Sequence, residues 1–248
     1  MLRRFSTAVA FLTRIPINPG QAHTGEDVAR SSVFFPLVGC LLAAVQVLVL
    51  WVLNFSDVPI VLQAIAATVV LLLVGGGLHQ DGLADMADGF GGGFSKEKVL
   101  HIMRDSTIGT YGGLALLVSF STRIASLSYL CSVEGAWVWL FVAAALSRCS
   151  IGLGWLMPYA RDSGTGQSLT QLTGPSEVAG AIFSAVLIAV LCVGGQALLA
   201  VLFSLVVFSI MAWSCHKKIG GVTGDTLGAT TEITEIVLLA LGASLVVS

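Results

Sequence analysis

Three aspartates lie close together in a stretch that is otherwise rich in glycine and apolar residues. Asp81, Asp85 and Asp88 fall within GGGLHQDGLADMADGFGGG, residues 75–93. If the preceding apolar run continues as a helix through them, their spacing of i, i+4 and i+7 places the three carboxylates on one face, where like charges repel. A hard cation such as Mg²⁺ relieves that repulsion and keeps positions for water and substrate phosphates. We predict a metal and phosphate site here; the alternative is a solvated acidic helix end.

A second polar patch, HIMRDSTIGTYGG at 101–113, follows the aspartates. Arg104 suits a phosphate clamp, because guanidinium groups form strong hydrogen bonds to phosphate oxygens. Asp105 either completes a metal shell or caps the helix that follows. His79, just before the aspartates, either orients a carboxylate, binds phosphate or is a packed structural residue. We keep Asp105 and His79 as secondary candidates.

A third patch, GGVTGDTLGATTEITE at 220–235, supplies a fourth acid. Its density of Gly, Thr and Asp predicts a backbone nest for phosphate or a metal-binding turn. Glu232 and Glu235, which start the last apolar run, are further secondary candidates. The predicted ligands of one or two Mg²⁺ ions are Asp81, Asp85, Asp88 and Asp225. The predicted catalytic residues are Asp85, Asp88 and Arg104, with Asp85 or Asp88 accepting a proton.

The composition of the chain predicts that these patches are positioned by membrane helices. Of the 248 residues, 56% are hydrophobic and 10% are charged, against about 25% charged in a soluble domain. No basic tract suggests nucleic-acid binding. We predict an all-α, polytopic integral membrane bundle, a single transferase domain over 1–248, with about seven spans of roughly 20 residues each. The candidate spans are 33–55, 58–78, 112–131, 136–157, 178–194, 197–214 and 233–248.

The distribution of basic residues predicts the orientation of the bundle. If the N-terminus is cytoplasmic, none of the twelve Lys and Arg residues falls in an outer turn, as the positive-inside rule requires. Arg123 and Arg148 lie within spans, as a structural ion pair or as substrate contacts. All three polar patches then face the cytoplasm from the cytoplasmic (inner) membrane, and contact with membrane lipid is implied.

The first sixteen residues predict an interfacial helix. Phe5, Val9 and Leu12 recur at helical spacing beside arginines, as in helices that lie in the membrane surface; a frayed cytoplasmic tail is the alternative. The segment 158–177, rich in Gly, Ser and Thr, is expected to be a mobile loop.

The motifs together resemble the cobalamin synthase family, the adenosylcobinamide-GDP ribazoletransferases, over nearly the whole chain. The resemblance rests on GGLHQDGLADMADG (76–89), MRDSTIGTYGGLAL (103–116), GVTGDTLGATTEITE (221–235), FLTRIP (11–16) and FFPLVG (34–39). It implies an integral membrane enzyme that requires Mg²⁺ and joins α-ribazole, or its 5'-phosphate, to adenosylcobinamide-GDP. GMP is released and adenosylcobalamin, or its 5'-phosphate, is formed. The oligomeric state is left open.

Two positions depart from the family pattern, and two other classes of protein remain as alternatives. Gln80 replaces a commonly apolar residue, and Thr107 a commonly basic one, so no phosphate contact is carried over to position 107.

A CDP-alcohol phosphotransferase-like lipid enzyme is one alternative: Asp85, Asp88 and Gly89 fit the start of that motif, but two glycines replace its Ala-Arg pair. An ion-coupled transporter is the other, although such proteins more often carry ionisable groups at mid-membrane.

Overall fold

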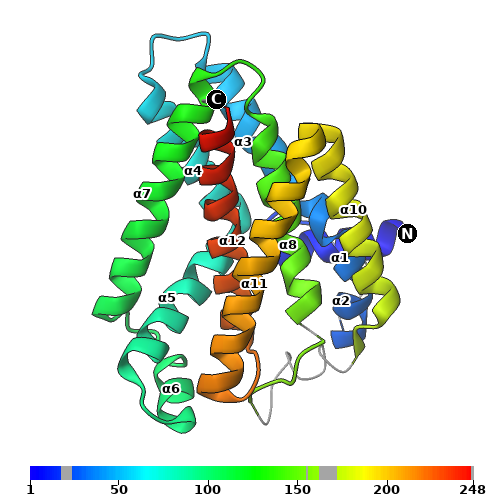
Figure 1. The fold of residues 1–248 in the computed structure, drawn as a ribbon, viewed down its shortest axis with the longest axis vertical. Helices are drawn as coiled ribbons and strands as arrows, with labels where there is room; N and C mark the ends of the chain where they lie inside the picture. The colour runs from blue at the N-terminus through cyan, green and yellow to red at the C-terminus, as the bar shows by residue number, and fades with distance from the viewer. Residues whose placement is uncertain (18–23, 155, 162–171, 247–248) are drawn as a thin grey trace.

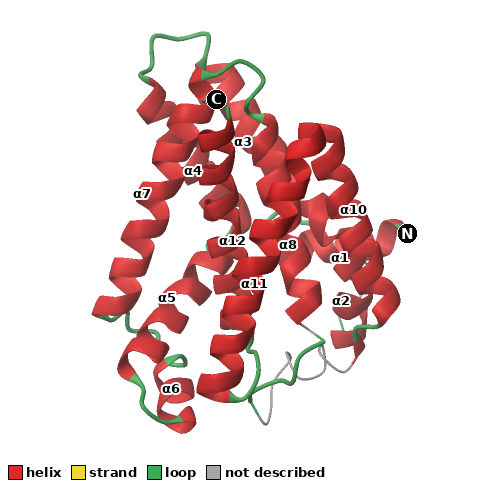
Figure 2. Cartoon of the chain, viewed as in Figure 1, coloured by secondary structure: helices red, strands yellow, loops and turns green. Residues whose placement is uncertain are grey.

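The chain folds into an elongated bundle of helices (Figure 1). The structure, a computed structural model, describes residues 1–17, 24–154, 156–161 and 172–246. Within these ranges the secondary structure is helical apart from an isolated bridge between Tyr159 and Val222, and Figure 2 shows the helices connected by loops. The prediction of an all-α fold is confirmed.

Each predicted apolar run overlaps one long helix, although the last of these helices begins nine residues before the run predicted at 233–248. These helices are α3 (Phe35–Leu53), α4 (Ile60–Gly75), α7 (Thr110–Ser132), α8 (Val138–Gly154), α10 (Pro175–Val193), α11 (Ala197–Ile219) and α12 (Gly224–Leu245). Shorter helices are α1 (Leu2–Leu12), α2 (Gly25–Ser31), α5 (Leu78–Gly92) and α6 (Lys96–Ile102), with single 3-10 turns at Ser32–Phe34 and Gly194–Gln196.

Several helices have the length and composition of membrane spans. Among the described residues four helical stretches qualify, at 25–53, 110–132, 175–219 and 224–245. The pair α4 and α5 makes a fifth if it is counted as one broken span, and α8 is apolar but shorter. The polytopic membrane prediction is thereby confirmed, whereas the total of about seven spans and the cytoplasmic N-terminus stay predictions.

Helix α12 occupies the middle of the bundle and contacts α5, α7, α8 and α11. Its small residues and its buried polar groups face these neighbours, and most of its first half is buried. Helices α10 and α11 instead expose large apolar side chains such as Phe183, Leu191 and Leu198. Exposed apolar surface on this scale fits contact with lipid.

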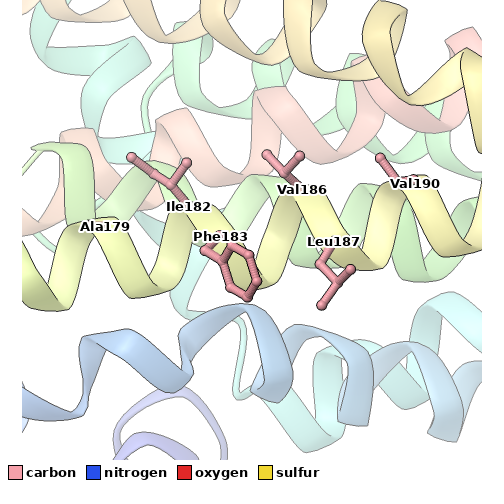
Figure 3. A pocket seen from close by; sticks show the side chains of 6 residues that line it. All are labelled: Ala179, Ile182, Phe183, Val186, Leu187 and Val190. Atoms are coloured by element: carbon pink, nitrogen blue, oxygen red, sulfur yellow. The ribbon is translucent and has the colours of Figure 1, made fainter.

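An apolar groove of about 540 Å³ runs along α10. Its lining residues all come from that one helix (Figure 3): Ala179, Ile182, Phe183, Val186, Leu187 and Val190. No polar side chain contributes to it, so we assign it to the lipid-facing surface and not to the chemistry.

The N-terminal segment forms the predicted helix. Val9 and Leu12 of α1 are buried against α2 and α3, and the Arg14 N–H donates to the Val74 carbonyl at 2.7 Å. The alternative of a frayed tail is therefore wrong for residues 2–12. The placement of this helix in the membrane interface stays a prediction.

The helix that precedes the three aspartates does not continue through them. Gly76 and Gly77 both adopt left-handed backbone angles, with φ of 71° and 70°, and α5 leaves α4 at 90°. Glycine adopts this conformation without the steric cost of a side chain. The predicted continuation of the second span is wrong, but all three aspartates still share one helix, α5.

Candidate active site

Asp88 faces the start of α7. Its two carboxylate oxygens accept N–H groups from Gly109 at 2.7 Å and from Gly112 at 2.9 Å. A side chain at either glycine would collide with this carboxylate. Asp88 therefore fixes the N-terminus of α7 against α5, where a negative charge is favourable. Each oxygen keeps a second lone pair, and the metal and proton-accepting roles of Asp88 stay predictions.

Asp81 and Asp85 lie instead beside Asp225, in the first turn of α12. Asp85 is within electrostatic range of both other acids, and Asp81 and Asp225 line the same pocket. Gly82 makes this approach possible, because a Cβ there would lie only 2.5 Å from the carbonyl oxygen of Asp225. The backbone of α12 therefore packs directly against Gly82. The predicted fourth acid does meet the first patch.

The turn before α12 is shorter than the sequence predicted. Thr223 caps the helix: its hydroxyl accepts the Thr226 N–H at 3.2 Å, and the Thr226 hydroxyl accepts the Thr223 N–H at 2.8 Å. Residues 224–235 are consequently helical and do not form a nest or a metal-binding turn. The reason is that this reciprocal capping box satisfies the first backbone donors of a helix.

Arg161 is a site residue that the sequence analysis missed. Its Nη2 lies 2.6 Å from Oδ2 of Asp225, and both side chains are partly buried. The segment is held by two backbone hydrogen bonds, Ala160 N–H to Val222 O at 2.9 Å and Val222 N–H to Pro158 O at 2.8 Å. The expected mobile loop is therefore wrong for 158–161; 162–171 lie outside the described residues.

A pocket of about 160 Å³ opens beside the acids. Its walls come from α1, α5, α8, α12 and the segment at Tyr159. The apolar part consists of Phe11, Leu12, Leu78, Ile151, Tyr159 and Leu227; the polar part consists of His79, Asp81 and Asp225; glycines 82, 224 and 228 complete it. The arrangement suits a flat, largely apolar group that carries a polar substituent toward the carboxylates.

Glu232 and Glu235 belong to a buried charge network with Arg123 and Arg148. Arg123 bridges both acids, with Nη2 at 2.9 Å from Glu232 and Nη1 at 2.7 Å from Glu235, and Arg148 also pairs with Glu235. All four side chains are at most 3% exposed. Two positive and two negative charges compensate one another, so the structural ion-pair interpretation of the arginines is confirmed.

Gln80 and His79 lie between the acids and this network. The Gln80 amide donates to Glu232 at 2.6 Å, and the Ser119 hydroxyl donates to the other oxygen of Glu232 at 2.6 Å. His79 is 7% exposed, and its Nε2 has no hydrogen-bond partner among the described residues. It borders both the pocket and a cavity of about 10 Å³ beside Arg148, and its functional role stays a prediction.

The second patch forms the turn between α6 and α7. Oδ1 of Asp105 accepts the Thr107 N–H at 2.9 Å, and this backbone hydrogen bond lowers the pKa of the Asp105 carboxyl. Asp105 thus shapes the turn before α7, as in the capping alternative. Arg104 is exposed at this turn, and its contact with phosphate stays a prediction.

The carboxylates do not form a closed Mg²⁺ site made of protein ligands alone, but they fit a Mg²⁺ site that water and substrate phosphates complete. Within the described ranges, no group of three His, Cys, Asp or Glu side chains is close enough to hold a metal on its own, so the four predicted ligands do not form a closed cage. Magnesium usually needs only one or two carboxylates, with water and substrate phosphates as its other ligands. The adjacent, partly exposed Asp81, Asp85 and Asp225 meet that requirement.

Comparison with known proteins gives consistent matches over the whole chain. The sequence profile of a family described as Cobalamin-5-phosphate synthase matches residues 4–243. Relatives named adenosylcobinamide-GDP ribazoletransferase include a Shewanella amazonensis protein, 37% identical over 96% of this chain and 93% of the relative. Others come from Sinorhizobium medicae, 38% identical over 94% and 92%, and Klebsiella pneumoniae, 34% identical over 96% and 98%. No solved structure matches significantly.

Proposed function

The chain belongs to the cobalamin-5-phosphate synthase family, and we propose that it joins α-ribazole, or its 5'-phosphate, to adenosylcobinamide-GDP with release of GMP. The names of relatives that cover more than nine-tenths of the chain support this reaction. The structural observation that carries the proposal is the convergence of Asp81, Asp85 and Asp225 beside a pocket in a membrane bundle. Such a cluster suits a reaction in which charge builds up on phosphoryl oxygens.

We propose that Asp81, Asp85 and Asp225 hold Mg²⁺ together with the pyrophosphate of the substrate. When bound, the ion would neutralise charge on the phosphoryl oxygens and on the leaving phosphate. Asp88 contributes by fixing α7 against α5, because both of its oxygens already accept backbone N–H groups. Arg104 is retained as a residue that can reach phosphate from the turn before α7.

The chemical step is a displacement at phosphorus. A ribose hydroxyl of α-ribazole attacks the phosphorus on the cobinamide side, a new P–O bond forms, and the P–O bond to GMP breaks. The hydroxyl proton passes to a carboxylate, for which we propose Asp85, since it is partly accessible and, among the described residues, accepts no hydrogen bond comparable to those at Asp88. GMP departs with the bridging oxygen. Positioning and electrostatics supply most of the rate enhancement in such transfers.

We place the planar base of α-ribazole in the pocket of about 160 Å³. Its walls of Phe11, Ile151, Tyr159 and Leu227 are apolar, and they would leave the donors and acceptors of a guanine largely unpaired, at a cost in binding. The ribose would then lie toward Asp81 and Asp225, where the hydroxyl must be activated. We further propose that this end of the bundle faces the cytoplasm, in agreement with the distribution of basic residues.

The reaction is tested with the full chain in detergent, labelled α-ribazole, adenosylcobinamide-GDP and Mg²⁺. Incorporation of the label with stoichiometric release of GMP is expected. Release of CMP from a CDP-lipid, without incorporation of α-ribazole, would contradict the proposal in favour of a lipid phosphotransferase. The matched control is Asp57→Asn, an exposed acid in the turn between α3 and α4, which should retain full activity.

A further inference from the structure

Arg161 is positioned within a group of acids that lacks enough positive charge. Its Nη2 lies 2.6 Å from Asp225, and its charge also acts on Asp85. Apart from Asp88, which is bonded to the start of α7, these residues and Asp81 amount, within the described part of the chain, to three carboxylates and one guanidinium, which leaves two net negative charges. That deficit equals the charge of one divalent cation. Arg161 therefore occupies part of the place that a metal ion needs.

The hydrogen bonds of Arg161 are incomplete. A guanidinium has five N–H donors in a planar fork, yet the structure pairs Nη2 with Asp225 and leaves the buried Nε without an acceptor among the described residues, as it also does at Arg123 and Arg148. A buried donor without a partner is costly. A phosphate can satisfy two donors of the fork at once, which a single carboxylate oxygen does not do.

The backbone around Arg161 is anchored, so an exchange of partners needs only the side chain to move. The bonds between Ala160, Pro158 and Val222 hold this segment against the start of α12. The side chain thus stays next to the positive end of that helix, where anions are also favoured. A long side chain on a fixed backbone, adjacent to both an acid and a phosphate position, is suited to alternate between them.

We propose that Arg161 binds the pyrophosphate of the nucleotide substrate and changes partners to do so. In the free enzyme it pairs with Asp225; when substrate and metal bind, Asp225 turns to the metal and Arg161 to the phosphate oxygens. This inference rests on the proposed function. It makes Arg161 a competitor of the metal for Asp225 and a contact of the substrate.

The proposal predicts effects of opposite sign in Arg161→Gln. Without substrate, Mn²⁺ should bind more tightly, by a few-fold, because Asp225 is released; this is measured by electron paramagnetic resonance on the full chain in detergent. GDP, as a probe for the pyrophosphate, should bind at least about tenfold more weakly by calorimetry, because charge-assisted hydrogen bonds are lost. The KM for adenosylcobinamide-GDP should rise, and that for α-ribazole should not.

Two further variants separate this role from a structural one. Arg161→Lys keeps the charge and loses the fork, so Mn²⁺ affinity should stay near wild type while GDP affinity falls; this variant also decides the matter if Arg161→Gln does not fold. Arg30→Gln removes an exposed arginine that pairs with Glu26, also at 2.6 Å, and should change neither affinity.

Unchanged or weaker Mn²⁺ binding in Arg161→Gln, or unchanged GDP binding in either Arg161 variant, would show that the arginine only holds its loop against α12. Failure of the proposed function would appear differently, as absence of GMP release from the wild-type chain, and would leave the opposite shifts in Mn²⁺ and GDP affinity intact.

Discussion

Two groups of charged residues share helix α12 and differ in the balance of positive and negative charge. Asp81, Asp85 and Asp225 are at least partly exposed, and Asp81 and Asp225 border a pocket. Among the residues described here, the guanidinium of Arg161 pairs with Asp225 and acts on Asp85. The neighbouring network is fully buried, with two arginines against two glutamates. Every carboxylate oxygen of that network accepts at least one hydrogen bond. Removing one partner from a buried, compensated group of charges is strongly destabilising, whereas a partly exposed group of acids beside a pocket is a candidate for ligand binding.

The position of the network explains how the membrane bundle holds the acids in place. Glu232 accepts hydrogen bonds from Gln80 of α5 and from Ser119 and Arg123 of α7. Since Gln80 directly precedes Asp81, this contact fixes the rotation of α5 against α12. The buried charges thus help to position the neighbouring acids.

Removal of Arg123 should have the largest effect. Arg123→Ala leaves Glu232 and part of Glu235 uncompensated in the bundle, which should lower the free energy of unfolding by about 3–5 kcal/mol. Thermal unfolding and the yield of folded chain in detergent measure this loss. Stability equal to wild type would show that the two groups of charges do not differ in the way described.

Removal of Asp85 should act on activity and not on stability. Asp85→Asn should lower GMP release at least about 100-fold, because the reaction loses a metal ligand and a proton acceptor. Its unfolding temperature should be equal or higher, since repulsion from Asp81 and Asp225 is relieved. Turnover near that of wild type would contradict the assignment of Asp85.

A side chain at Gly82 should disturb both the acid cluster and the buried arginine–glutamate network. In Gly82→Ala the added Cβ meets the backbone of Asp225, and separating α5 from α12 should cost about 1–3 kcal/mol and lower kcat. The control is Gly113→Ala, a position where an added Cβ meets nothing within 4 Å. Equal behaviour of the two variants would argue against close helix contact as the requirement at Gly82.

The smallest effect is expected at Gln80. Gln80→Leu removes one hydrogen bond from Glu232, which keeps its bonds to Arg123 and Ser119. We expect a loss of about 1 kcal/mol in the free energy of unfolding and a modest fall in kcat. A loss as large as that of Arg123→Ala would show that Gln80 is an essential part of the network.

The sequence predicted the positions of the helices and of the acidic residues better than it predicted which groups these residues contact. The bilayer dictates the length and apolarity of a span, so each apolar run could be located, and Asp225 was correctly brought to Asp81 and Asp85. The bend at Gly76 and Gly77 was not predicted, because glycines permit a helix break without requiring one. The role of Asp88 at α7 was not predicted either, since it depends on packing between separate helices.

Arg161 is the clearest example of a site residue that could not be predicted from the sequence. It lies 64 residues before Asp225, and the segment that holds it pairs with residue 222 through an isolated bridge, which leaves no periodic signal in the sequence. The buried network was half predicted: the cost of a lone charge in a span indicated that Arg123 and Arg148 need partners, but helix packing alone selects Glu232 and Glu235.

The most direct test of the uncompensated acid cluster is the dependence of thermal unfolding on Mg²⁺. A cation that binds the folded chain raises the unfolding temperature as its concentration increases. We predict that wild type and Asp57→Asn show this rise, whereas Asp85→Asn and Asp225→Asn show no rise. Asp85→Asn should begin at an equal or higher temperature, and Asp225→Asn at a lower one because its ion pair with Arg161 is lost. A wild-type response to Mg²⁺ in both variants would contradict the account, because the ion would then bind elsewhere.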